Sequence, residues 1–284
     1  MARSGQLWRG VVGLVLPVLL AGCGSGAIVV AGPPRASPYE GPLYVEVTAP
    51  PTDEKADRSG AAGLVVRCAS KPVGSSWDEP YAGEVGSTPE RGLQEAFDDS
   101  QFSWPAAGYR KARAEDDRVL FTYDNDGAPL AAIVMRRGPT LDRHTGWHIE
   151  SFARCNLADF PESFAEDLDL QVWTDQLGRR VSTDLIVSGP GPAHCDWQDM
   201  TFLSIDGGDL ESGQTYVSHP DPELEDYFAE AYVAAQALPP DAVDSGYSLA
   251  GGHLWFSPDR QRAYVGQPQE VARWPATVKP LGCA

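Results

Sequence analysis

The sequence lacks the short signatures that mark common hydrolases and phosphate-binding enzymes. It contains no Gly-x-Ser-x-Gly elbow, no His-Glu-x-x-His, no Ser-x-x-Lys and no glycine-rich loop ending in Lys-Ser or Lys-Thr. Each of these patterns places a nucleophile, a zinc ion or a phosphate where the chemistry needs it. No motif in the sequence therefore assigns a catalytic residue, and we expect no cofactor and no metal.

Positive charge is also scarce, with 22 Lys and Arg against 40 Asp and Glu and a net charge of -18. A field of this sign repels nucleic-acid backbones and anionic lipid headgroups. We therefore expect no nucleic-acid partner and no electrostatic docking on membranes. High solubility is the simplest role for the acidic surface.

No apolar run is long enough to span a bilayer, which requires about 20 residues. The run over residues 11–20 is roughly half that length. It follows Arg3 and Arg9 and ends in Leu20-Ala21-Gly22-Cys23. A positive leader, an apolar stretch and small residues before a cut are typical of an export signal.

The last four of these residues resemble the lipobox of bacterial lipoproteins. The resemblance implies that residues 1–22 are a signal peptide and that Cys23 receives a diacylglycerol on sulfur, often with a further acyl chain on the new amino terminus. Two or three chains attach a protein durably. The expected location is the extracytoplasmic face of the cell membrane, with a net charge near -20 once Arg3 and Arg9 are removed. The alternative is a secreted protein cut elsewhere.

Four further cysteines, an even number, would remain in the exported chain, and such thiols usually pair. Three connectivities are open. We favour Cys68 with Cys155 and Cys195 with Cys283, because each pair brackets a segment of domain size. A zinc site is the weaker alternative, since no two of the four have CxxC spacing.

The pattern of apolar residues predicts an α+β protein of disulfide-linked antiparallel sheets with one helix in each of two modules. We expect a lipidated amino terminus and flexible tether over residues 23–60, with an outlying strand at residues 43–48. A first α+β module then covers residues 61–160, and a second, β-rich module covers residues 161–284.

In the first module, a strand at residues 64–68 precedes a helix capped by Thr88, and four strands follow at residues 109–114, 118–123, 130–136 and 147–155. A single helix cradled by a curved sheet has the architecture of cystatin-like or nuclear-transport-factor-2-like folds.

In the second module, strands are expected at residues 171–174, 185–188, 200–205, 247–249, 254–256, 263–266 and 271–274. Asp221 and Pro222 begin the strongest helix pattern in the chain, with Leu224, Tyr227 and Phe228 on one face.

Three stretches contain residue types that are found in metal sites or in pockets. Residues 124–127 resemble part of a calcium loop, although a hairpin turn explains them better. His144 and His148 have metal-binding spacing only in a helix, and this stretch leads into a strand. His194, Asp196 and Asp199 form the densest polar cluster, either lining a pocket or lying on a disulfide-linked loop beside Trp197.

Tryptophans could also stack on sugars of a cell wall, although most should be core. The candidates are Trp147, Trp173, Trp197, Trp255 and Trp274.

The whole chain resembles uncharacterised envelope lipoproteins and secreted proteins of high-GC Gram-positive (actinobacterial) bacteria. The shared features are the lipobox, the helix after Thr88, Gly146-Trp147 before Cys155, the cluster at residues 194–199 and Arg273-Trp274-Pro275 before Gly282-Cys283. That group implies no particular activity. We expect a non-enzymatic binding or scaffolding module of the envelope, with either a protein or a glycan as partner. The alternative is an envelope hydrolase with a carboxylate site near residues 194–199.

Overall fold

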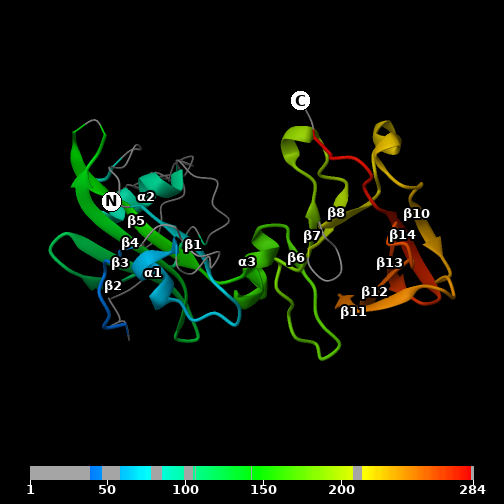
Figure 1. Cartoon of the computed structure of the whole chain (residues 1–284), viewed down its shortest axis with the longest axis horizontal. Helices are drawn as coiled ribbons and strands as arrows, with labels where there is room; N and C mark the ends of the chain where they lie inside the picture. Colours follow the sequence, from blue (N-terminus) through cyan, green and yellow to red (C-terminus); the bar gives the residue numbers. More distant parts are fainter. Residues whose placement is uncertain are drawn as a thin grey trace, which may run out of the picture.

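The computed structural model describes residues 39–46, 58–77, 85–98, 105, 107–141, 143–206 and 213–282. They form an α+β structure of three antiparallel sheets with few helices, as the sequence predicts. One sheet lies in the first half of the chain and two lie in the second half (Figure 1). The expected lipidation site, Cys23, falls outside the described residues.

The first sheet has the strand order β1-β5-β4-β3-β2. Strands β3 and β4 are joined by a tight hairpin in which Asp126 and Gly127 have φ values of 50° and 83°. Two positive φ values are typical of the type I′ turn, which favours Asp-Gly. The hairpin explanation of residues 124–127 is therefore confirmed. The strands are β1 (Val73–Ser76), β2 (Arg110–Ala114), β3 (Arg118–Asn125), β4 (Ala128–Pro139) and β5 (Thr145–Arg154).

Helix α2 (Pro89–Asp98) confirms the helix expected after Thr88. The Thr88 hydroxyl accepts a hydrogen bond from the Arg91 amide at 3.2 Å, which satisfies one unpaired amide of the first turn. The helix packs on β5 so closely that a Cβ at Gly92 would lie 2.3 Å from the Trp147 carbonyl oxygen. Only glycine fits this contact.

The strand expected at residues 64–68 is wrong, because Leu64 and Val65 belong to helix α1 (Gly60–Val65). Ala61 and Ala62 are fully buried, so these small side chains let the helix approach β5 and β4. The chain becomes extended only at Val66, after which the Arg67 amide donates to the Pro129 carbonyl at 2.8 Å. In the described residues of the first half, two helices, α1 and α2, thus pack on the sheet where one was expected.

Residues 39–46 pack against the first sheet. Leu43 is buried in its core, and Arg113 donates to the Gly41 carbonyl at 2.6 Å. This part of the segment expected to be a flexible tether is therefore in the fold, although it forms no strand; residues 47 and 48 of the expected strand lie outside the described range.

Strand β5 contains a bulge at Glu150. Val134 pairs with Ser151 and Met135 with Ile149, so Glu150 is an extra residue with no partner on β4. Its carbonyl instead accepts a hydrogen bond from the Trp77 amide at 2.8 Å. The carboxylate is held by Arg118 through two hydrogen bonds of 2.7 and 2.8 Å.

Two sheets in the second half share one core. Trp173 is fully buried between them, and its indole donates to the Ser188 hydroxyl at 3.0 Å. Their orders are β6-β7-β8-β9 and β10-β14-β13-β12-β11. The strands are β6 (Gln171–Val172), β7 (Ile186–Pro190), β8 (Thr201–Ile205), β9 (Gln214–Ser218), β10 (Val233–Gln236), β11 (Val243–Leu249), β12 (Gly252–Phe256), β13 (Arg262–Gln267) and β14 (Glu270–Pro275).

The prediction of a helix that begins at Asp221 is wrong beyond the first turns. Asp221 does cap, accepting from the Glu223 amide at 2.8 Å, but only the 3-10 helix η4 (Pro222–Tyr227) forms. At Phe228 the backbone becomes extended and pairs with Thr277, and the Ala229 amide donates to the Ala276 carbonyl. Strand-like pairing with the carboxyl-terminal segment therefore overrides the local helical pattern.

The expected disulfide between Cys68 and Cys155 is present, with a Cα–Cα distance of 5.0 Å. It connects the loop after α1 to the end of β5. Cys195 is disulfide-bonded as well, and its expected partner Cys283 lies outside the described residues.

A short helical connection links the first sheet to the second half (Figure 1). Asn156 accepts hydrogen bonds from the amide and the hydroxyl of Thr183 at 2.8 and 3.1 Å. Arg180 donates to the Phe160 carbonyl. These contacts attach the loop before β7 to the connection. The remaining helical elements are η2 (Leu157–Asp159), α3 (Glu162–Asp167) and η3 (Ala193–Cys195).

Candidate functional site

The three pocket candidates from the sequence lie on an exposed loop. His194 is in η3, and Asp196 follows it in a left-handed conformation with φ 59°. The side chains of His194, Asp196 and Asp199 are all exposed. None of them is among the described lining residues of the cavities over β8 and β9, beside η4, or beside β6 and β7.

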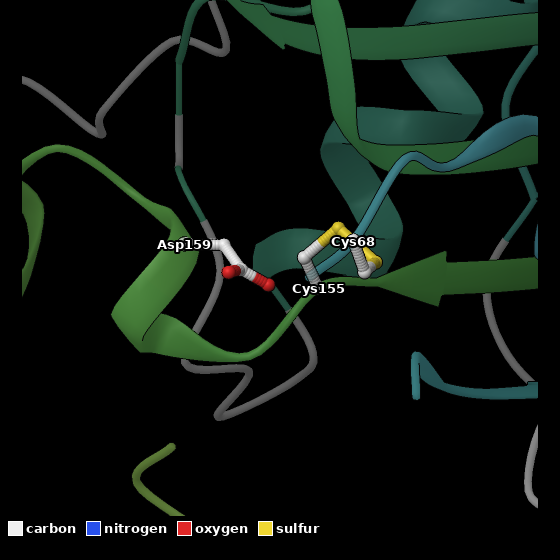
Figure 2. Close-up of side chains that lie close together, drawn as sticks. All are labelled: Cys68, Cys155 and Asp159. Carbon is white, nitrogen blue, oxygen red and sulfur yellow. A yellow bond between two sulfur atoms is a disulfide. The ribbon is translucent and has the colours of Figure 1, made fainter. Parts of the chain in front are cut away.

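Cys68, Cys155 and Asp159 come together beside the first sheet (Figure 2). Their sulfur and carboxylate atoms lie within 4.8 Å of one another, and this is the only such ligand group in the described part of the chain. The two sulfurs are bonded to each other, so they are not available as thiolate ligands.

The position of the Asp159 carboxyl group beside the disulfide is explained by its hydrogen bonds with the backbone. Burial raises the pKa of its carboxyl group, while hydrogen bonds from the backbone at Ala69 and Asn156 favour the charged form. Since Ala69 directly follows Cys68, these bonds hold the loop next to the disulfide. The cluster therefore stabilises the junction at the end of β5 and is not a metal centre in this state.

A groove of about 550 Å³ lies over β8 and β9, on the face of this sheet that points away from the shared core. Its walls are the loop after η3 and the carboxyl-terminal segment 277–281. The described residues that line it are Pro192, Trp197, Phe202, Ser204, Gly213, Gln214, Thr215, Thr277, Val278, Lys279, Pro280 and Leu281. The volume is within the ordinary range for small-ligand sites.

One end of the groove is an aromatic wall. The rings of Trp197 and Phe202 stack with centroids 6.1 Å apart and planes 26° apart. Gly191 makes this possible, because a Cβ there would lie 2.6 Å from the Phe202 ring and from the Trp197 Cβ. Both rings pack on the small cluster around Met200. The wall is therefore fixed from beneath.

The floor of the groove is a row of hydroxyl groups. Ser204 on β8 lies directly opposite Thr215 on β9. Thr277 follows next in the row, because its amide donates to the Thr215 carbonyl at 2.9 Å. Within the described residues, none of the three hydroxyls donates or accepts an intramolecular hydrogen bond. No side chain or backbone group of the described residues therefore competes for these three hydroxyls.

The charge of the groove differs from that of the whole molecule. No Asp or Glu is among its described lining residues, although the chain has 40 of them. The one charged residue in the described lining is Lys279, whose Nζ lies 5.4 Å from the Tyr227 ring centroid. A second cavity, of about 490 Å³, is instead lined by Glu225, Asp226 and Glu230.

The sequence indicates this site only in part. Trp197 is one of the five tryptophans that could stack on sugars, and three of the others, Trp173, Trp255 and Trp274, are buried in the core. Alternation along β8 predicts that Phe202 and Ser204 share a face. Residues 277–281 have no pattern that would have placed them at a groove.

Comparisons with protein families, with curated proteins and with solved structures find no match to this chain. In the residues that the structure describes, no helix has the length and apolar character needed to cross a membrane.

Proposed function

We propose that the protein is a non-enzymatic binding module of the bacterial envelope, held at the outer face of the cell membrane by lipid on Cys23. The groove over β8 and β9 is its binding surface. The observation that carries the proposal is the combination of a rigid aromatic wall with three hydroxyls that have no intramolecular partner among the described residues. Ligand sites typically pair an apolar surface with a few convergent polar groups.

The hydrolase alternative has less support. It requires carboxylates that converge in a cleft, whereas Asp196 and Asp199 are exposed and are not among the described lining residues of the cavities over β8 and β9, beside η4, or beside β6 and β7. Binding is therefore the function that the described residues support better.

The anchor is tested by fractionation. We expect the wild-type chain in the membrane fraction and Cys23→Ala in the soluble or secreted fraction, because only the lipid would attach the protein durably. Retention of Cys23→Ala in the membrane would contradict the anchor.

The binding surface is tested by photo-crosslinking in intact cells. A benzoylphenylalanine replaces Ser204 on the groove floor in one variant and Ala235, an exposed residue of β10, in the control. We expect a defined adduct from position 204 and none from position 235. An absence of adducts at position 204 would overturn the proposal.

A further inference from the structure

We propose that the groove binds an uncharged oligosaccharide, with one sugar ring stacked on the aromatic wall and its hydroxyls bonded to the row formed by Ser204, Thr215 and Thr277. The proposal rests on the binding function above and specifies the class of ligand. Four observations support it.

The aromatic wall suits a ring with an apolar face. Trp197 and Phe202 are held as a stacked pair by the space that Gly191 leaves and by the cluster beneath them. An aromatic ring offers a flat apolar face and loses little side-chain freedom on binding. The carbon-bound hydrogens of a sugar ring form a complementary flat surface.

The hydroxyl row suits a ligand with many hydroxyl groups. Ser204 and Thr215 are cross-strand neighbours, and Thr277 continues their line, so the three oxygens form a row across the strands. A hydroxyl donates and accepts, as sugar hydroxyls do. Each can therefore exchange water for a sugar oxygen without leaving a polar group unpaired.

The charge of the described lining favours an uncharged ligand. Cations and basic peptides would find no carboxylate among the described lining residues. Polyanions would find Lys279 as the one cation among those residues and would meet the field of a molecule with net charge -18.

An added peptide strand is excluded by the edge of the sheet. Peptide recognition of this kind needs unpaired backbone groups. At the edge of β9, Tyr216 pairs with Ala276, and the Thr215 carbonyl already accepts from Thr277. Side chains rather than backbone groups are therefore left to bind the ligand.

The direct test is titration of the full chain with chitotriose and cellotriose, in a detergent that has no sugar headgroup. Binding is followed by tryptophan fluorescence and calorimetry. We expect a dissociation constant of about 0.1–1 mM for at least one probe, in the range of a single stacked contact with hydrogen bonds. The absence of binding by either probe at about 10 mM would overturn the proposal.

Two groove variants and two controls locate the site. Trp197→Ala and Ser204→Glu should each weaken binding at least about tenfold. Trp77→Ala repeats the loss of an indole and Ala235→Glu repeats the added negative charge, each at an exposed position outside the groove, and both should leave binding unchanged. Ser204 is exposed, so its variant keeps the test valid if Trp197→Ala perturbs folding. Equal binding by all four variants would overturn the proposal.

The crosslinked adduct separates this inference from the proposed function. An adduct from position 204 that a cell-wall glycosidase releases would support the oligosaccharide. An adduct that only a protease releases would overturn the oligosaccharide and leave the binding function standing. No adduct would overturn both.

Discussion

The two halves of the molecule each contain an Arg–Glu–Arg triad, but in different surroundings. In the first half, Glu150 is 3% exposed, accepts two hydrogen bonds from Arg118 and lies 3.7 Å from Arg136. In the second half, Glu230 is 34% exposed and contacts Arg262 at 2.7 Å and Arg273 at 3.4 Å. The same combination of one Glu and two Arg thus forms one buried cluster and one partly solvated cluster.

Burial, rather than composition, therefore decides what an ion cluster contributes to stability. A buried carboxylate without its partner has a large desolvation cost. A partly exposed carboxylate can exchange its partner for water. The bulge in β5 explains why Glu150 is buried, because the extra residue lies within a strand whose neighbours are in the core.

The largest expected effect is that of Glu150→Gln. It removes the buried partner of the Arg118 guanidinium, whose hydrogen bonds are the main reason that the pKa of Arg118 is raised. The exposed carboxylate of Asp117, 2.8 Å from Arg118, remains as its other partner. We expect the free energy of unfolding of the first half to fall by about 1.5–3 kcal/mol, the cost of losing hydrogen bonds to a charged group. Urea unfolding and hydrogen exchange at β4 amides measure it. A loss below about 1 kcal/mol is the range of surface ion pairs. It would contradict the expectation that burial makes this cluster important for stability.

The next effect is a pH dependence from His148, which also lies beside the first triad. Burial lowers the pKa of His148, and the positive charge of Arg136 lowers it further. The unfolded chain therefore binds the proton first, and stability should fall as the pH drops below about 6.5 towards the lower folded pKa. His148→Gln should flatten the stability curve in this window. The exposed His144→Gln is the control, and an unchanged slope in His148→Gln would refute the explanation.

A smaller effect is expected from Glu230→Gln, the matching change in the second half. Its carboxylate is one-third exposed, so water can replace the lost ion pairs. We expect a loss of about 0.5–1 kcal/mol in urea unfolding. A loss equal to that of Glu150→Gln would remove the contrast between the halves.

The smallest effect is the response to salt. At about 1 M salt the screening length is about 3 Å, and exposed pairs are screened more than buried ones. The cost of Glu230→Gln should therefore decrease towards zero between low and high salt, while that of Glu150→Gln should persist. The opposite order would show that exposure is not the controlling variable.

Much of the first half was predictable because its signals are local. Strands β2 to β5 follow from alternation and turns, and α2 follows from its cap at Thr88. The bulge at Glu150 was not predictable, since it depends on the register between β4 and β5.

The second half shows how distant pairing defeats local pattern. Leu224, Tyr227 and Phe228 have helical spacing, yet the segment turns extended where it meets Thr277 and Ala276. The same carboxyl-terminal segment forms one wall of the groove, so the site was missed for the same reason. Only the tryptophan at position 197 could have indicated it.

Gly191 has a consequence for how the protein could vary. A methyl group at this position would come within 2.5 Å of the Trp197 carbonyl oxygen and 2.6 Å of the Phe202 ring. Gly191 is not itself one of the described residues that line the groove. A single-nucleotide change to alanine would thus displace the Trp197–Phe202 wall while every side chain that lines the groove keeps its identity.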